Sequence, residues 1–181
     1  MPHTPIDELR PMVHIALMAA LVAAGAFVAI PVGPVPIVLQ NFFVMLTGLL
    51  LGQRRGLAAI GLYLLAGGLG LPVFAGGTGG LGRLAGPTGG YLVGYLPAVA
   101  VIGMVSRAGQ GRVWADALAM VAGTAIVYGF GLTWLKLITG MTLAKTMALG
   151  LVPFLPGDVV KIVAALPVAR ALRPLIQKEA A

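Results

Sequence analysis

Six apolar segments in the chain constrain its fold more than any other feature of the sequence. They cover approximately residues 12–30, 37–51, 56–71, 91–105, 115–137 and 155–172. A helix crosses a hydrocarbon core about 30 Å thick with roughly 20 residues, so each segment is a candidate membrane span. The second, third and fourth segments are shorter, and we expect them to tilt, extend into their flanks or lie behind other helices. The pattern predicts an all-α integral membrane protein with about six transmembrane helices.

The overall composition supports this class. Hydrophobic residues make up 59% of the chain and charged residues only 9%, where a soluble domain has about 25% charged residues. The absence of Cys excludes disulfides and thiolate chemistry, and no cluster of metal ligands occurs. Gly77, Gly79 and Gly82 match a dinucleotide-binding pattern but lack the strand that this motif requires. We predict one polytopic membrane domain over residues 1–181, without cofactor or metal.

The basic residues indicate an orientation. With six spans and an inner N-terminus, eight of them fall on the cytoplasmic side: Arg10, Arg54, Arg55, Arg107, Arg112, Arg170, Arg173 and Lys178. Three fall on the outer side: Arg83, Lys136 and Lys145. This excess is the positive-inside pattern, so both termini are expected in the cytoplasm of a bacterium and the chain in its cytoplasmic membrane. Because the cations follow segment ends, they predict no nucleic-acid partner.

An acid and a base lie in the sixth segment. Asp158 and Lys161 are three residues apart, so on a helix they share a face and can pair. A charge deep in the bilayer costs about 2.5 to 3.5 kcal/mol, and such residues persist mainly where they line a polar cavity or serve a function. The alternative is an ion pair that holds the helix at the interface while Lys161 reaches the headgroups. We treat the pair as a candidate site.

Three unusual connections are expected together on the outer side. The first, residues 30–41, contains three prolines that favour extended backbone, and it ends in Gln40 and Asn41. The second, residues 71–91, is rich in glycine, which lets backbone amides approach a ligand closely. The third leads into the segment of Asp158. Irregular backbone at membrane depth must be buried in protein or line a cavity. Simple turns, a flexible linker or amides that satisfy neighbouring backbone are the alternatives.

Side chains near these connections suggest the chemistry of a ligand. Arg83 is an outer cation beside the glycine-rich stretch and suits a carboxylate. Gln40, Asn41 and Thr88 offer neutral polar contacts. Aromatic residues can supply apolar walls or instead face lipid as an interfacial belt: Phe74, Tyr91, Tyr95, Tyr128, Phe130, Trp134 and Phe154. The expected ligand is small and partly apolar, with an amide-like head and an acid tail.

Four motifs resemble those of a known family. They are GPVPIVLQ at 33–40, GLPVF at 70–74, GPTGGY at 86–91 and PFLPGDVVK at 153–161. Together they resemble the BioY family, the biotin-binding S components of energy-coupling factor (ECF) vitamin transporters. The resemblance extends over nearly the whole chain. One departure is Val38, where the family often has Thr, so a hydroxyl contact at that position is in doubt.

The resemblance implies roles for the candidate residues. Asp158 would accept hydrogen bonds from the ureido N–H groups of biotin, and Lys161 or Gln40 would donate to the ureido oxygen. Arg83 as the carboxylate ligand is an inference from charge, and the glycine-rich stretch would close as a lid. The predicted biotin-binding residues are Gln40, Asn41, Phe74, Thr88, Tyr91, Arg83, Asp158 and Lys161.

The resemblance also implies partners. The sequence has no P-loop, and S components depend on a transmembrane T component and two cytoplasmic ATPase subunits for energy. Ala16, Ala20 and Ala24 are spaced four apart, which gives a small-residue face that permits close helix approach and resembles the docking face of S components. Internal packing, or the helix preference of Ala, is the alternative reading of this face.

Three other functions stay open from the residues alone. The chain could be an S component for another small vitamin-like carboxylate, because related S components share the six-helix plan. It could be a membrane enzyme that uses Asp158 as an acid or base, although no acid–His partner accompanies its single serine, Ser106. It could also be a structural or channel-forming subunit. We predict a non-enzymatic biotin-uptake component.

Overall fold

The computed structural model describes the backbone of residues 5–177 and the side chains of residues 9–176. Lys178, one of the predicted inner cations, lies outside the described residues. Within this range the chain forms seven helices: α1 Pro5–Phe27, α2 Gln40–Gly68, α3 Leu81–Ala85, α4 Gly89–Ala108, α5 Val113–Thr139, α6 Leu143–Gly150 and α7 Leu155–Gln177. Two short strands, β1 Ala29–Ile30 and β2 Ile37–Val38, pair antiparallel between α1 and α2.

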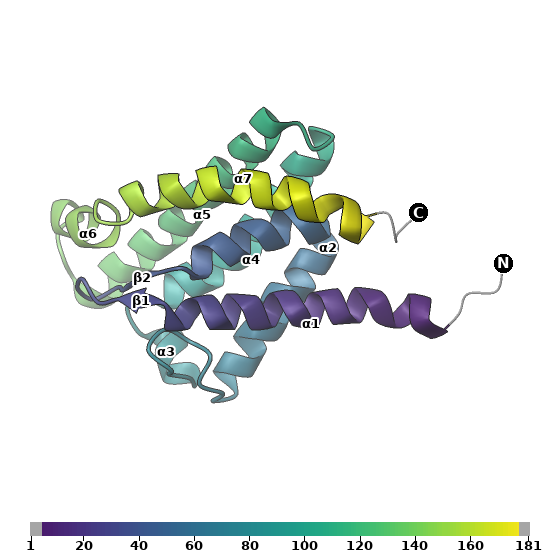
Figure 1. Cartoon of the computed structure of the whole chain (residues 1–181). Helices are drawn as coiled ribbons and strands as arrows, with labels where there is room; N and C mark the ends of the chain where they lie inside the picture. The colour runs from purple at the N-terminus through teal and green to yellow at the C-terminus, as the bar shows by residue number, and fades with distance from the viewer. Residues whose placement is uncertain (1–4, 178–181) are drawn as a thin grey trace.

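The second and third predicted segments are the two arms of α2. Gly52 breaks the helix with φ 72° and ψ −172°, a conformation that glycine adopts without the penalty of a Cβ atom. Figure 1 shows the first arm running toward the end where α1 begins and the second arm turning away from it. The arms touch beside the break, where a Cβ atom on Gly56 would lie 3.9 Å from the Cα of Gly48. The two arms are thus separate helical segments, as the sequence predicted.

The count of spans depends on this break. Four helices are long and apolar enough to cross a membrane, and the pair α6–α7, bent by 44°, gives a fifth span. The apolar segments predicted about six because they count the two arms of α2 separately. The share of buried residues is 61% in the spans of α2 and α4 but 28% in that of α1 and 39% in that of α5. Helices α2 and α4 therefore form the centre of the bundle, with α1, α5 and α7 around them.

Gly103 shows how closely the central helices approach. A Cβ atom at Gly103 in α4 would lie 2.3 Å from the backbone N of Gln53 and 2.5 Å from the carbonyl carbon of Gly52. We expect Gly103→Ala to lower the free energy of unfolding by about 1–3 kcal/mol, because a backbone turn has to shift. Thermal unfolding in detergent tests this. Gly61→Ala is the matched control: nothing lies within 4 Å of its Cβ position, so its stability should stay equal or rise. Equal losses in both variants would contradict the steric explanation.

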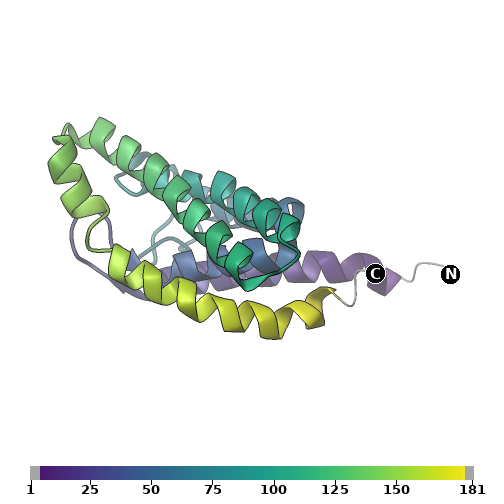
Figure 2. The ribbon, with the colours of Figure 1, turned by 90° about the horizontal axis from the view of Figure 1, so that it is seen from above.

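The two ends of the bundle differ in structure (Figures 1 and 2). The beginning of α1, the break in α2, the connection of α4 to α5 and the end of α7 lie at one end. The three unusual connections meet at the other end, as predicted. The proline-rich one forms the β1–β2 pair, with Ala29 opposite Val38 and Ile30 opposite Ile37. The other two hold short helices, α3 and α6, which the sequence had not predicted.

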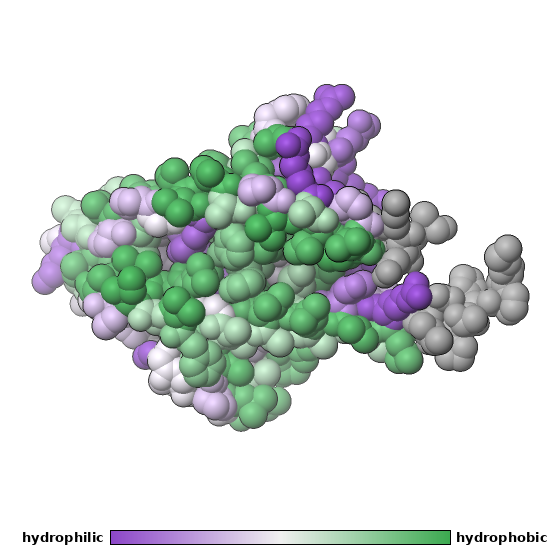
Figure 3. All heavy atoms as spheres, in the orientation of Figure 1, coloured by the Kyte–Doolittle hydropathy of each residue, from purple (hydrophilic) through white to green (hydrophobic). Residues whose placement is uncertain are grey.

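The outer surface suits a bilayer. In the space-filling view, apolar side chains cover most of the face formed by α1 and α7, and hydrophilic residues gather toward the end where α4 meets α5 (Figure 3). Large apolar side chains are exposed along several helices, among them Val13, Val121, Val160 and Val163. In water these side chains would be unfavourable, whereas lipid tails solvate them at no cost. The chain is a multi-pass membrane protein.

Candidate ligand-binding site

A cavity lies among the outer connections, at the level where α2, α4, α5 and α7 come together. Its free volume is about 40 Å³, which is space for a few water molecules. A larger ligand therefore has to displace some of the lining. The lining residues come from the β1–β2 region, the glycine-rich stretch, helices α2, α4 and α5, and the connection from α6 to α7: Val35, Pro36, Val38, Gln40, Asn41, Phe74, Ala75, Thr88, Tyr91, Leu92, Tyr95, Tyr128 and Phe154.

The predicted acid–base pair forms behind one wall of this cavity. Lys161 Nζ donates to Asp158 Oδ1 at 2.9 Å, and the hydroxyl of Tyr128 in α5 donates to Asp158 Oδ2. Asp158 is 3% exposed and Lys161 is 9% exposed, so the pair is buried in the bundle. Lys161 therefore does not extend to the surface, as a contact with lipid headgroups would require. Tyr128 lines the cavity and connects the carboxylate to it.

Amide side chains at the start of α2 supply further polar atoms. The hydroxyl of Tyr95 donates to Asn41 Oδ1 at 2.6 Å. Gln40 is 2% exposed, and its Nε2 atom is buried without a hydrogen-bond acceptor among the described residues. A buried amide without a partner costs about 1–3 kcal/mol. Gln40 lines the cavity, and its amide lies beside the hydroxyl of Tyr63, which also has no partner within hydrogen-bond geometry among the described residues.

The glycine-rich stretch contributes Phe74 to the site. This side chain is 1% exposed and packs edge-to-face on Tyr63, with ring centroids 5.5 Å apart. It fits because Gly67 has no side chain; a Cβ atom there would lie 2.2 Å from the Phe74 ring. The backbone of Phe74 also pairs with that of Thr78, which closes a tight turn. These contacts show that the stretch is ordered around Phe74 and is not a loose linker. We call its residues 71–80, which carry Phe74 into the cavity wall, the plug.

The predicted cation and one predicted aromatic residue are held by backbone carbonyls. Arg83 Nη2 donates to the carbonyl oxygen of Ala75 at 3.2 Å, which places the guanidinium beside a lining residue at the rim. The hydroxyl of Tyr91 donates to the carbonyl oxygen of Gly150 at 2.9 Å and ties α4 to the end of α6. The ring of Tyr91 lines the cavity, whereas its hydroxyl is occupied by the hydrogen bond to Gly150.

The eight predicted residues gather in one region. Gln40, Asn41, Phe74, Thr88 and Tyr91 line the cavity directly. Asp158 is linked to it through Tyr128, Lys161 through Asp158, and Arg83 through Ala75. Their role in binding stays a prediction.

Some features were not anticipated from the residues. Tyr95 and Tyr128 were expected only as apolar walls, yet both donate hydrogen bonds to site residues. No spacing in the sequence signals a partner of Asp158 that lies 30 residues away. Phe130 and Trp134 do not line the cavity. They are 47% and 36% exposed and line an apolar groove between α4 and α5, which fits the lipid-facing alternative for Phe130, whereas the indole N–H of Trp134 donates to the carbonyl oxygen of Gly86.

The small-residue face of α1 is exposed. Ala16, Ala20 and Ala24 all lie on the outside of the bundle, whereas Ala19 and Ala26 face α2. Internal packing does not explain the three exposed alanines within the described residues. The face is free to contact another membrane helix.

Comparison with known proteins identifies the family to which the chain belongs. A model described as the BioY family matches residues 1–178. The biotin transporter BioY of Thermotoga maritima is 39% identical over 167 residues, covering 92% of this chain and 98% of that one. The biotin transporter BioY of Rhodobacter capsulatus is 41% identical over 177 residues, covering 90% and 93%. A crystal structure of the S-component for biotin from an ECF-type ABC transporter superposes with a TM-score of 0.88 at 30% identity, over 95% of each chain. This chain belongs to the BioY family.

Proposed function

We propose that this chain binds biotin in the outer cavity and acts as the substrate-specific S component of an ECF transporter for biotin uptake. The observation that carries the proposal is the buried Tyr128–Asp158–Lys161 group beside an aromatic cavity, in a chain of this family. The proposed activity is binding and transport, without chemical conversion of the ligand.

The polar atoms of the cavity match the head of biotin. A ureido group has two N–H donors and one carbonyl acceptor. The hydroxyl oxygen of Tyr128 accepts a hydrogen bond from one ureido N–H while the same hydroxyl still donates to Asp158. Alternatively, Asp158 accepts directly from the ureido group when Tyr128 turns aside. Gln40 Nε2 donates to the ureido carbonyl, which gives this buried amide the partner that it lacks. Asn41 and Thr88 complete the polar contacts.

The rest of the ligand follows the lining toward the rim. The thiophane ring contacts the aromatic rings of Phe74 and Tyr91, which are buried in the cavity wall. The carboxylate lies near Arg83, whose guanidinium keeps donors free beyond its single bond to Ala75. Because the free volume is about 40 Å³, the plug that carries Phe74 has to move for the ligand to enter.

The energising partners complete the proposal. Transport against a gradient needs a transmembrane T component and two ATPase subunits, because this sequence has no P-loop. The exposed face of Ala16, Ala20 and Ala24 is the proposed contact with the T component, since small residues let two helices pack closely.

Equilibrium binding to the detergent-purified chain tests the function. We expect tight binding of biotin and none of comparable strength for other vitamins. Folded protein that fails to bind biotin would overturn the proposal.

Replacement of Arg83 tests the site at its rim. We expect Arg83→Gln to weaken biotin binding about tenfold, because a charge-assisted hydrogen bond to the carboxylate is lost. The same variant should bind uncharged biotin amide as the wild type does. Lys145→Gln, which removes another exposed outer cation, is the matched control and should bind both ligands normally. An equal loss for biotin and its amide would place the carboxylate elsewhere.

A further inference from the structure

A large hollow opens at the end of the bundle opposite the cavity. It has a volume of about 1180 Å³ and lies between the break in α2, the end of α4 and the end of α7. Five of its lining residues are large and apolar: Leu49, Leu50, Leu51, Met104 and Ile176. Five others are polar or basic: Gln53, Arg54, Arg55, Arg107 and Gln110. The hollow is therefore amphipathic.

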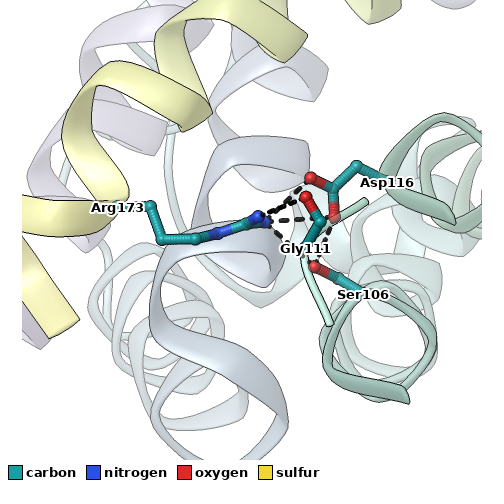
Figure 4. A network of polar contacts seen from close by, with 4 residues as sticks. All are labelled: Ser106, Gly111, Asp116 and Arg173. Atoms are coloured by element: carbon teal, nitrogen blue, oxygen red, sulfur yellow. Dashed lines mark hydrogen bonds and ion pairs between the residues drawn. The ribbon is translucent and has the colours of Figure 1, made fainter. Parts of the chain in front are cut away.

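One arginine of this region is fully engaged. Arg173 of α7 donates through Nη2 to both carboxylate oxygens of Asp116, at 2.9 and 3.1 Å, and to Ser106 Oγ at 3.1 Å (Figure 4). Its Nη1 donates to the carbonyl oxygen of Gly111 at 3.2 Å. Ser106 donates in turn to Asp116 at 2.6 Å, and Asp116 is 1% exposed. The only acid at this end among the described side chains is thus already neutralised.

The other three arginines of the hollow have no such partner. Within residues 9–176, no ion pair or hydrogen bond engages the guanidinium groups of Arg54, Arg55 or Arg107. The second acid in this range, Asp158, lies at the opposite end with Lys161. Three positive charges around one hollow repel one another and favour a bound anion. The charge alone fits any phosphate, but the apolar wall beside it needs a ligand with a hydrocarbon part.

We infer that this hollow is a binding site for an anionic phospholipid of the adjacent leaflet. The guanidinium groups of Arg54, Arg55 and Arg107 hold the phosphate, for which their planar donors are well suited. An acyl chain lies on Leu51, Met104 and Ile176 and covers apolar surface that water would otherwise meet. Basic pockets between helices at the inner face of a membrane recognise acidic headgroups in this way.

Two other arginines at the same end allow a matched control. Arg112 and Arg170 are exposed like Arg54 and Arg107 but do not line the hollow. If lipid is attracted only by positive charge in general, binding depends equally on these four arginines. If the hollow is a specific site, binding depends on Arg54 and Arg107 and not on Arg112 and Arg170.

Native mass spectrometry of the delipidated, detergent-purified chain tests the inference. Phosphatidylglycerol and phosphatidylcholine with identical acyl chains are the probes. We expect the wild type to retain one phosphatidylglycerol in preference to phosphatidylcholine, and Arg54→Gln/Arg107→Gln to lose about tenfold of that preference. Arg112→Gln/Arg170→Gln should keep it. A melting temperature close to that of the wild type would show that each variant is folded.

Three results would overturn the inference. The first is an equal loss of preference in the control pair, which means diffuse charge attraction. The second is competition by inorganic phosphate or glycerophosphoglycerol as effective as that of the lipid, which means a site for a soluble anion. The third is the absence of a headgroup preference in the wild type, in which case the three arginines would instead contact an acidic protein partner. Biotin binding is measured separately, so failure of one proposal leaves the other standing.

Discussion

Asp158→Ala is expected to lower biotin affinity at least about a hundredfold and to destabilise the fold. Its carboxylate holds Lys161 and Tyr128 at once, and both it and Lys161 are buried. Removal of one partner from a buried ion pair costs about 3–5 kcal/mol, because the remaining charge has neither water nor a counterion. In the proposed mode the variant also loses the acceptor that orients Tyr128 toward the ureido group. Equilibrium binding and thermal unfolding, each with and without biotin, measure the two effects.

A second buried acid supplies the control for this experiment. Asp116→Ala removes the partner of Arg173 at the opposite end of the bundle, so it also costs stability. Its folded fraction should bind biotin with wild-type affinity. The double variant Asp158→Asn/Lys161→Met removes both charges and should regain stability without regaining binding. Wild-type affinity in folded Asp158→Ala protein would exclude the role that we assign to this residue.

Ala20→Trp is expected to reduce biotin uptake in cells at least about tenfold while binding to the purified chain is unchanged. Ala20 lies on the exposed face of α1, away from the cavity, and a large ring prevents the close helix approach that small residues permit. Uptake of labelled biotin by cells that contain the T component and the ATPases measures the first effect. Copurification of the T component measures the contact directly.

Ala125→Trp is the matched substitution. Ala125 is exposed in α5, which packs on α4 and lies across the bundle from α1 (Figure 2). This variant should transport biotin and copurify with the T component normally. If Ala20→Trp also lost biotin binding, a role of α1 in holding the bundle together would replace the docking role.

Much of the fold was predictable because apolar length is a local property. The segments 91–105, 115–137 and 155–172 each lie within a single helix, α4, α5 and α7. The run GQRR after residue 51 indicated a boundary, and Gly52 breaks α2 there. The sequence could not show how closely other helices pack on this break, since this depends on contacts such as that of Gly103 with the turn. That the whole chain is one domain stays a prediction.

The candidate site was predictable to the extent that its chemistry is unusual in a membrane. Asp158 and Lys161 stand out because charges in an apolar segment are costly. Tyr128 did not stand out, because tyrosine is common in membrane proteins and its partner is set by the packing of α5 against α7. For the same reason Phe130 and Trp134, only a few residues further on, looked equivalent to Tyr128 but do not line the cavity.

The packing of Phe74 has a consequence for the rate of binding. Its ring fills the space above Gly67, rests on Tyr63 and leaves a cavity of about 40 Å³. In the proposed binding mode, an incoming molecule must therefore wait for a conformational opening, and the same plug slows its departure. Association is then slower than diffusion permits and levels off at high ligand concentration, and apparent affinity is reduced by the small open fraction. If the ligand binds there as we propose, the chain retains scarce molecules by long residence rather than by rapid exchange.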